Sequence, residues 1–381
     1  MLKTPGALRS LLNDPSELTL AEDFIDDHLD VEGDIFAVFP VAEHLFSLPR
    51  SLEGRVASAM KHYVSDIVRY CKRGPLHTVA RDRAAIAQHY DDQPADFYRP
   101  WLGESLAYSC AYFRSPDESL DVAQENKLEL ICRKLRLSST DRFLDVGCGW
   151  GSLILHAAQL YGAEARGITL SRSQAAVATR RITDAGIARR CAVEFRDYRD
   201  ATSIGDPFDK IASVGMFEHV GLANLRRYFA IIFDLLKPGG LFLNHGIARS
   251  ACSPPRRDSF MDAHVFPDGQ LVPVSQAMQL AESVGFEIRD VENLREHYAR
   301  TLRLWVEALQ QNSESVLAKS SKKTYRTWLL YMAGCAFTFD CGDIAIYQIL
   351  FRRRKDGRCS LPMTRECFYQ DWPQEESRLV A

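Results

Sequence analysis

Alternate glycines follow a short apolar stretch and could hold a ligand against the backbone. They are Gly147, Gly149 and Gly151. The expected strand at 143–146 precedes them, a helical repeat of apolar residues follows at 153–160, and a second strand is expected at 165–170. Glycine permits close approach of the backbone and a positive φ, and a helix start offers free N–H groups. The stretch 144–174 therefore predicts a βαβ unit that binds a ligand at its first turn.

The spacing of the glycines separates two kinds of nucleotide site. A dinucleotide site has G-x-G-x-x-G and an acidic residue after the second strand. Here the third glycine comes one residue early and the second strand ends in Thr169 and Leu170, which disfavours a dehydrogenase. With Asp145 the motif becomes D-x-G-x-G-x-G, which resembles the S-adenosylmethionine (SAM) motif of class I methyltransferases. A structural glycine turn without a ligand is the alternative.

The wider pattern predicts an α/β protein. Seven strands are expected, at 143–146, 165–170, 192–195, 208–214, 241–245, 286–291 and 345–351. Helices alternate with most of them, which is typical of a mainly parallel, Rossmann-like sheet with helices on both faces. We expect three regions: a small helical N-terminal domain (1–84), a cofactor lid with connecting helices (85–138), and a catalytic domain (139–381). Insertions at 250–275 and 295–340 would build a substrate pocket.

Composition restricts the class of protein. The 381 residues are 46% apolar and 25% charged, which is usual for a soluble globular protein. A net charge of −3 argues against nucleic-acid binding. The ten cysteines form no C-x-x-C pair or metal-like cluster, so we expect no metal site and reduced thiols in a cytoplasmic protein. No signal peptide or membrane span is expected.

The first third of the chain is predicted to be largely helical. Residues 1–40 suggest a helix, a turn at Gly33 and another helix, with the acidic stretch 20–34 as a solvated face. Residues 76–84 suggest a connector. Aromatic residues are dense over 90–113; this density is typical of a core, but interrupting polar residues favour a cofactor lid. A helix is expected at 117–137, where Lys127 occupies one of the periodic, otherwise apolar positions.

A basic amphipathic helix is expected at 51–73. Its apolar residues fall on one helical face, and basic residues occupy the rest. Such a helix can lie on an anionic membrane surface, or pack on its own domain or on a second subunit. Peripheral contact with the inner face of the membrane and a homodimer are both expectations from this stretch.

Further motifs resemble one family over nearly the whole chain. They are LAEDFIDDHLDVEGD (20–34), YSCAYF (108–113), GITLSRSQ (167–174), RDYRD (196–200), SVGMFEHVG (213–221), LNHGIA (243–248), FPDGQLVPVSQ (266–276), REHYARTL (295–302) and YMAGCAFTFDCGDIAIYQ (331–348). In this order they resemble the cyclopropane-fatty-acid synthases and the mycolic acid cyclopropane synthases. HYDDQPADFY (89–98) departs from the family's HYDVGNDFY, which leaves the closure of that loop open.

The resemblance implies a cofactor, SAM, and a set of residues around it. Tyr108 and Ser109 would fold over its methionine part, and the turn after Asp145 would bring the backbone of the three glycines to it. The residues expected at the ribose and adenine are Thr169, Leu170, Gln174, Asp197 and Tyr198. For Thr169 alone, a buried strand-end hydroxyl is an equal alternative.

The resemblance also implies a reaction and a base. A cis double bond of an unsaturated phospholipid acyl chain would attack the activated methyl group, and the resulting carbocation would lose a proton from the new methyl to a bound bicarbonate. The residues implied around bicarbonate are Cys110, Glu218, His245, Ile247 (through its backbone) and Tyr298. A helix-start carboxylate and a core histidine are the structural alternatives for Glu218 and His245. Aromatic residues that could stabilise the cation are Phe217, Tyr298, Tyr331 and Phe337.

Other functions fit the same motifs. A fatty acid C-methyltransferase would give methyl-branched or methylene products by the same chemistry, and a small-molecule N-methyltransferase is more distant. A non-enzymatic SAM- or lipid-binding module is disfavoured, because both cofactor and base residues are present.

Overall fold

A seven-stranded sheet forms the centre of the molecule. The computed structural model describes residues 1–4, 6, 16–47, 77–91, 93–253, 259–355 and 361–370, so the expected helix at 51–73 lies outside the described residues. The strands are β1 (Arg142–Val146), β2 (Glu164–Thr169), β3 (Cys191–Phe195), β4 (Phe208–Val214), β5 (Leu236–Arg249), β6 (Phe286–Asn293) and β7 (Ile344–Arg353). All seven predicted strands are confirmed; β5 begins and ends several residues beyond its prediction.

The order of the strands is β3-β2-β1-β4-β5-β7-β6. The first five run parallel, and β7 lies antiparallel between β5 and β6. Because parallel strands end at one edge, the turns after β1, β2, β3 and β4 gather there. The order reverses between β1 and β4, which is where doubly wound sheets bind their ligands.

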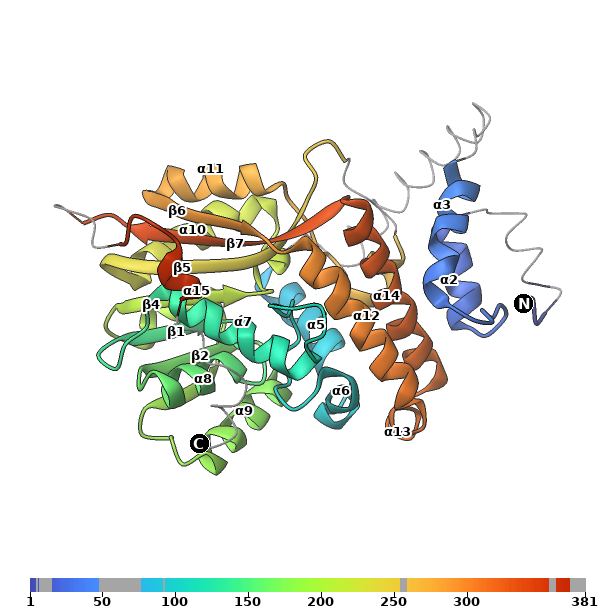
Figure 1. Ribbon diagram of the computed structural model, residues 1–381, viewed down its shortest axis with the longest axis horizontal. Helices are drawn as coiled ribbons and strands as arrows, with labels where there is room; N and C mark the ends of the chain where they lie inside the picture. Colours follow the sequence, from blue (N-terminus) through green and yellow to red (C-terminus); the bar gives the residue numbers. More distant parts are fainter. Residues whose placement is uncertain are drawn as a thin grey trace.

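Helices cover both faces of the sheet (Figure 1). On one face α7 (Leu120–Leu135), α8 (Ser152–Leu160) and α9 (Arg172–Asp184) pack on alternate strand residues such as Phe143 and Leu243. On the other face α10 (Leu222–Leu235) and α11 (Val274–Val284) pack on Leu144 and Phe242. This alternation is the period of a strand buried on both sides, and it confirms the predicted Rossmann-like fold.

A helical layer lies beyond the carboxyl edge of the sheet. It contains α12 (Arg295–Gln311), α13 (Ser313–Leu317) and α14 (Lys322–Cys341), as predicted for the insertion before the last strand. With α6 (Ala95–Leu102) these helices enclose an aromatic core in which the Trp101 and Trp305 rings meet edge to face at 5.9 Å. Phe97, Tyr98 and Trp101 are fully buried, so this part of the expected lid is core.

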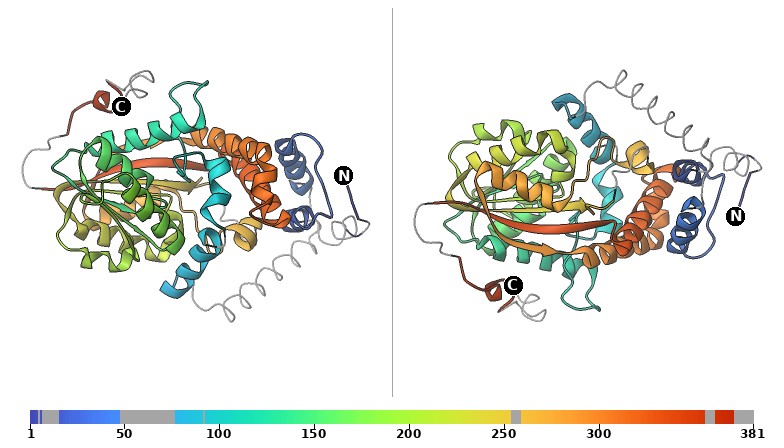
Figure 2. Two further views of the ribbon diagram at one scale, coloured as in Figure 1. Left: turned by 90° about the horizontal axis from the view of Figure 1, so that it is seen from below. Right: turned by 90° about the horizontal axis from the view of Figure 1, so that it is seen from above.

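The N-terminal helices pack against this layer. They are α2 (Glu17–Ile25), the short η1 (Ile35–Ala37) and α3 (Val38–Ser47), with Gly33 at a φ of +93° between them, as predicted. Figures 1 and 2 show α14 and α12 between them and the sheet. The remaining short elements are η2 (Tyr198–Ile204), η3 (Phe217–His219), η4 (Met261–Val265) and α15 (Glu366–Tyr369).

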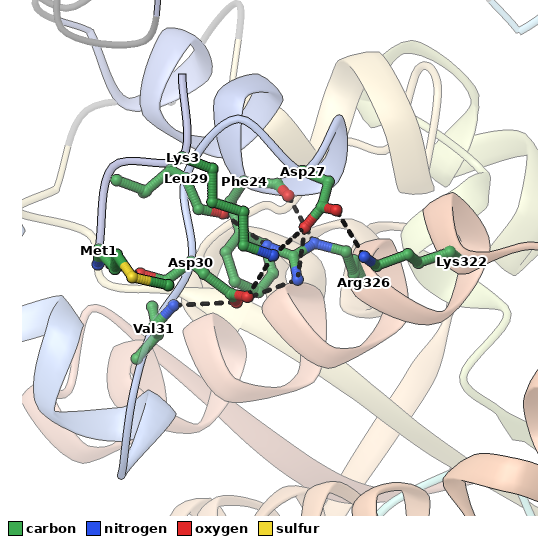
Figure 3. Close-up of polar contacts among 9 residues, drawn as sticks. All are labelled: Met1, Lys3, Phe24, Asp27, Leu29, Asp30, Val31, Lys322 and Arg326. Atoms are coloured by element: carbon green, nitrogen blue, oxygen red, sulfur yellow. Dashed lines mark hydrogen bonds and ion pairs between the residues drawn. The ribbon is translucent and has the colours of Figure 1, made fainter. Parts of the chain in front are cut away.

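The acidic stretch 20–34 is not the solvated face that we expected. Figure 3 shows Arg326 of α14 reaching into it, and its guanidinium donates to the carbonyl oxygens of Phe24 and Leu29, both at 2.6 Å, and to Asp30 at 3.1 Å. Asp27 accepts from Lys3 at 2.6 Å and also from Lys322. Arg326 is only 8% exposed, and hydrogen bonds of a charged group each contribute about 1.5–3 kcal/mol. The carboxylates therefore bind the N-terminal helices to α14.

The expected connector at 76–84 is wrong. The Thr78 hydroxyl accepts from the Arg81 N–H at 3.3 Å and caps α5 (Val79–Tyr90), which crosses the expected domain boundary at residue 84. Arg81 also forms two parallel hydrogen bonds to the Asp268 carboxylate, and both side chains are nearly buried. No helix among the described residues is long and apolar enough to cross a membrane.

Candidate active site

A cavity of about 1080 Å³, including its open mouth, lies at the carboxyl edge of the sheet. It is lined by most of the residues predicted to bind the cofactor: Tyr108, Ser109, Asp145, Gly147, Gly149, Thr169, Leu170, Gln174 and Tyr198. Gly151 and Asp197 do not line it.

The glycine turn after β1 has the conformation that its spacing predicts. Gly147, at a φ of +87°, lies against Met216, whose Cβ would be 2.9 Å from an added Cβ. Gly149, at +54°, would place a Cβ in open space, and it lines the cavity. Gly151 caps α8 instead, and an added Cβ there would lie 3.1 Å from Ala178. A side chain introduced at Gly149 would therefore meet a ligand in the cavity rather than another part of the described protein.

The turn after β2 is fixed by side-chain hydrogen bonds. The Thr169 hydroxyl donates to Gln174 Oε1 at 2.8 Å, and the Ser171 hydroxyl caps α9 by accepting from the Gln174 N–H at 3.0 Å. Ser171 also donates to the Asp91 carboxylate, which accepts from the Ser173 N–H at 3.3 Å. These hydrogen bonds hold the end of α5 against the turn after β2.

Helix α5 forms a wall of the cavity, and the lid predicted from residue 85 onward included its Ile86 and Tyr90 but not Asp82. Asp82, Ile86 and Tyr90 line it. The Asp82 carboxylate lies 3.0 Å from the Arg199 guanidinium, which also pairs with Asp197 at 2.7 Å. Asp197, expected at the adenine, is thus occupied by Arg199, while its neighbour Tyr198 does face the cavity. A helix cap at Thr78 followed by an acidic residue was the available signal.

Hydrogen bonds from Gln124 and to Tyr331 fix the loop that carries Tyr108 and Ser109. The Gln124 side chain on α7 donates to the carbonyl oxygens of Ala107 and Ser109 at 3.1 and 3.0 Å. The Tyr108 hydroxyl donates to the Tyr331 hydroxyl at 3.1 Å, and burial raises the pKa of Tyr108 well above its usual value. Tyr108 therefore stays a neutral donor at the cavity wall.

The predicted base residues do not line this cavity; Cys110, His245 and Tyr298 are buried, whereas Glu218 and Ile247 are half-buried. Glu218 Oε1 accepts from the Ile247 N–H at 2.7 Å, and Glu218 Oε2 has no hydrogen-bond partner among the described residues. Burial raises the pKa of Glu218 to about 7, against two backbone hydrogen bonds that lower it. The Ile247 N–H, expected to face an anion, is thus already used by Glu218.

His245 is fully buried, two residues before Ile247 on β5. The Gln348 amide lies 3.0 Å from His245 Nδ1, and the part of the chain that the structure describes offers Nε2 no hydrogen-bond partner. Burial lowers the pKa of His245 well below its usual value, so the ring is neutral. With the amide N–H donating to Nδ1, the ring proton sits on Nε2 and makes that atom a free donor. Gln348 is a residue that the sequence analysis missed.

Cys110 and Tyr298 complete the cluster electrostatically. Burial raises the pKa of both, and the proximity of Tyr331, Cys110 and Glu218, whose ionised forms would repel a phenolate, raises the pKa of Tyr298 further. Cys110 Sγ donates to the Ala111 carbonyl oxygen at 3.2 Å, and no hydrogen bond joins it to His245 in the described chain. The unpartnered Glu218 Oε2 and His245 Nε2 are the atoms that fit a small, hydrogen-bonding anion.

The aromatic residues expected near a cation have separate surroundings. Phe217 packs in the core beside α10 and is 4% exposed. Phe337 stacks on Phe39 of α3 at 5.8 Å. Tyr298 and Tyr331 are buried in the helical layer, where Tyr331 bonds Tyr108. The Phe217 ring also lies against Gly246, between His245 and Ile247, so Phe217, Tyr298 and Tyr331 adjoin the cavity wall or the base residues, whereas Phe337 packs on the N-terminal helices.

The chain is similar to known proteins over most of its length. Residues 77–349 match the family model described as mycolic acid cyclopropane synthetase. A probable fatty acid methyltransferase of Pseudomonas putida is 40% identical over 97% of this chain and 91% of its own length. The cyclopropane-fatty-acyl-phospholipid synthase of Escherichia coli K12 is 32% identical over 92% of this chain and 87% of its own length.

A solved structure is similar in fold as well. The crystal structure of mycolic acid cyclopropane synthase CmaA1, complexed with S-adenosylhomocysteine (SAH) and CTAB, has a TM-score of 0.66 and 32% identity. The similarity covers 71% of this chain and 98% of that one.

Proposed function

The chain belongs to the mycolic acid cyclopropane synthetase family and is a SAM-dependent methyltransferase of lipids, and from this premise we propose that it forms cyclopropane rings on unsaturated phospholipid acyl chains. The observation that carries the proposal is that Glu218 Oε2 and His245 Nε2 are both buried and both lack a hydrogen-bond partner among the described residues. Buried polar atoms of this kind suit removal of a proton from a carbon atom, which a simple transfer to nitrogen does not need.

The chemistry requires a methyl donor and a base. SAM, when bound, supplies an electrophilic methyl group. One alkene carbon bonds to it as the carbon–sulfur bond breaks, and the other alkene carbon becomes a cation. Loss of a proton from the new methyl group frees the C–H electron pair, which closes the ring.

We assign the base to bicarbonate held by this chain's buried donors. Neutral His245 would donate from Nε2, and Glu218, whose pKa of about 7 keeps it partly protonated near neutrality, would share its proton with the anion. Cys110 and Tyr298 would close the site from the facing loops. The Ile247 N–H would reach the anion only by exchanging its bond to Glu218.

A methyl-branched product is the second candidate. It is favoured by the 40% identity to a protein named probable fatty acid methyltransferase. The first bond would form in the same way, but the cation would lose a proton from the acyl chain rather than from the new methyl group. The position of the base relative to the cation would then decide the product.

Labelled cofactor separates the two products. The protein is incubated with SAM carrying a trideuterated methyl group and vesicles of an unsaturated phospholipid, and the fatty acids are analysed by mass spectrometry before and after hydrogenation of residual double bonds. A ring retains two deuterium atoms and takes up no hydrogen. A methyl-branched alkene retains three and does take up hydrogen. Absence of any labelled lipid would refute both.

Bicarbonate dependence tests the base. Degassing the buffer should lower the turnover of the wild type, and added bicarbonate should restore it. Glu218→Gln should leave SAM binding nearly intact and slow turnover about 100-fold, the scale of lost general-base help. A fully active Glu218→Gln enzyme that is indifferent to bicarbonate would contradict this mechanism without affecting the methyltransferase assignment.

A further inference from the structure

Lys127 places a buried ammonium group on the wall of the cofactor cavity. The side chain comes from α7 and its residue is only 2% exposed. Its Nζ donates to the Ser109 hydroxyl at 2.7 Å, and among the described residues no carboxylate oxygen lies within 4.0 Å of it. An ammonium group has three donors, and burying it without a counter-charge is costly. The Lys127 ammonium group therefore has no direct carboxylate partner among the described residues, although Asp145 in the same cavity is near enough to interact with its charge.

Lys134 on the same helix is a second buried lysine, and it does have carboxylate partners. Lys134 is fully buried as well, but its Nζ pairs with Glu292 and lies 3.7 Å from Asp290. Neither Glu292 nor Asp290 lines the cofactor cavity. The contrast indicates that Lys127 lacks a carboxylate partner because a ligand supplies one.

Asp145 provides the complementary group. It is 2% exposed, it lines the same cavity, and its Oδ1 has no hydrogen-bond partner among the described residues. Burial raises the pKa of Asp145 to about 7, while the charge of Lys127 opposes this increase. A cation without a carboxylate partner and a carboxyl oxygen without a donor, both lining one cavity, are complementary to the two charged ends of an α-amino acid.

We propose that Lys127 binds the α-carboxylate of SAM, with Ser109 orienting the ammonium group and Asp145 accepting from the α-amino group of the cofactor. The carboxylate is the only anionic group of SAM, because the adenosine is neutral and the sulfonium is positive. The adenosine end of SAM would then lie near Tyr198, which follows β3. Because β3 is two strands from β1 in the sheet, Tyr198 is about 10 Å from the turn after β1. This inference depends on SAM as cofactor but not on which lipid product is formed.

Two ligands and two variants test the proposal by calorimetry. The ligands are SAH and its decarboxylated analogue, S-adenosyl-3-thiopropylamine, which keeps the amine and lacks the carboxylate. Lys127→Met should weaken SAH binding about 10- to 100-fold, the range for a hydrogen-bonded charge, and change the affinity for the analogue less than about 3-fold. Lys134→Met is the matched control on the same helix and should leave the SAH to analogue affinity ratio unchanged.

Thermal melting of the free protein separates binding from structure. Methionine has nearly the length of lysine and removes an unpaired buried charge, so free Lys127→Met should melt at or above the wild type. Equal loss of affinity for both ligands, or a lower melting temperature with both weakened, would make Lys127 a structural residue and overturn the proposal. Unchanged SAH affinity would overturn it directly. A wild type that binds neither ligand would instead contradict the cofactor assignment.

Discussion

Gly149→Val is the substitution that most directly tests the cofactor cavity. Gly149 has a φ of +54° and lines the cavity, and a Cβ built there meets no protein atom within 4 Å. A valine side chain would consequently project into the space where the ligand must approach the backbone. Gly186, after α9, has a φ of +69° and an equally open Cβ position, but does not line the cavity. Gly186→Val is therefore a matched control for backbone strain.

The expected magnitudes keep strain and binding apart. A left-handed conformation costs a non-glycine residue about 1–2 kcal/mol, and a β-branched residue is at the upper end. Both variants should lose about this much from a total stability of about 5–15 kcal/mol, and both should remain folded. Saturation with SAM at about 100 times its Kd stabilises a binding-competent protein by about 2.7 kcal/mol. Only Gly149→Val should lose this second contribution.

Thermal melting with and without SAM, together with calorimetry, gives the result. The wild type and Gly186→Val should both melt at higher temperature with SAM, whereas Gly149→Val should show no shift and an affinity lower by at least about 100-fold, or about 2.7 kcal/mol. Unchanged SAM affinity in folded Gly149→Val would refute the placement of the cofactor. Loss of binding in Gly186→Val would show that strain alone explains the effect.

Two further predictions concern charge. The pKa of Glu218 is raised from 4.5 to about 7, so the folded state holds this proton more tightly and the wild type loses stability as the pH rises through this range. Glu218→Gln does not titrate, so its free energy of unfolding should gain about 2.5 kcal/mol relative to the wild type between about pH 5 and about pH 8. A difference in denaturant melts that does not change with pH would contradict the buried position of this carboxyl group. Replacing Lys61, Arg69 and Lys72 of the 51–73 stretch by glutamate should weaken the sedimentation of the protein with anionic vesicles, most at low salt. Unaffected sedimentation would favour the alternative that this stretch packs on its own domain or on a second subunit.

The fold was predictable because its signals are local. Each strand is a short apolar run between turn residues, and the glycine turn after β1 requires φ values that few other residues adopt. Contacts between distant segments were not predictable in this way. The acidic stretch near Asp27 has a solvated pattern, and only the three-dimensional structure places Arg326, almost three hundred residues later, within it.

The site shows the same division. Some residues that line the cavity, such as Gly149 and Thr169, belong to the sequence motif itself, and their place at the cavity could be predicted from the spacing of that motif. Lys127 did leave a sequence signal, a charge at an apolar position of a helix, but its meaning depends on which carboxylates the fold brings near it. Gln348 ends the motif at 331–348 but was given no role, because a polar residue in a strand becomes informative only when its partner His245 on the neighbouring strand is known.

The antiparallel strand β7 has a consequence for biosynthesis. It lies between β5 and β6, so β6 has no neighbour in the sheet until β7 has been made, and the three helices α12, α13 and α14 emerge from the ribosome in between. The Gln348 amide that orients His245 also arrives with β7. At a synthesis rate of about 5–20 residues per second, β6 waits several seconds without a hydrogen-bonding partner. A chain released before this strand would lack the buried Leu350 and Phe351 of the sheet core as well as the amide that orients His245, so premature termination would remove the packing and the base site together.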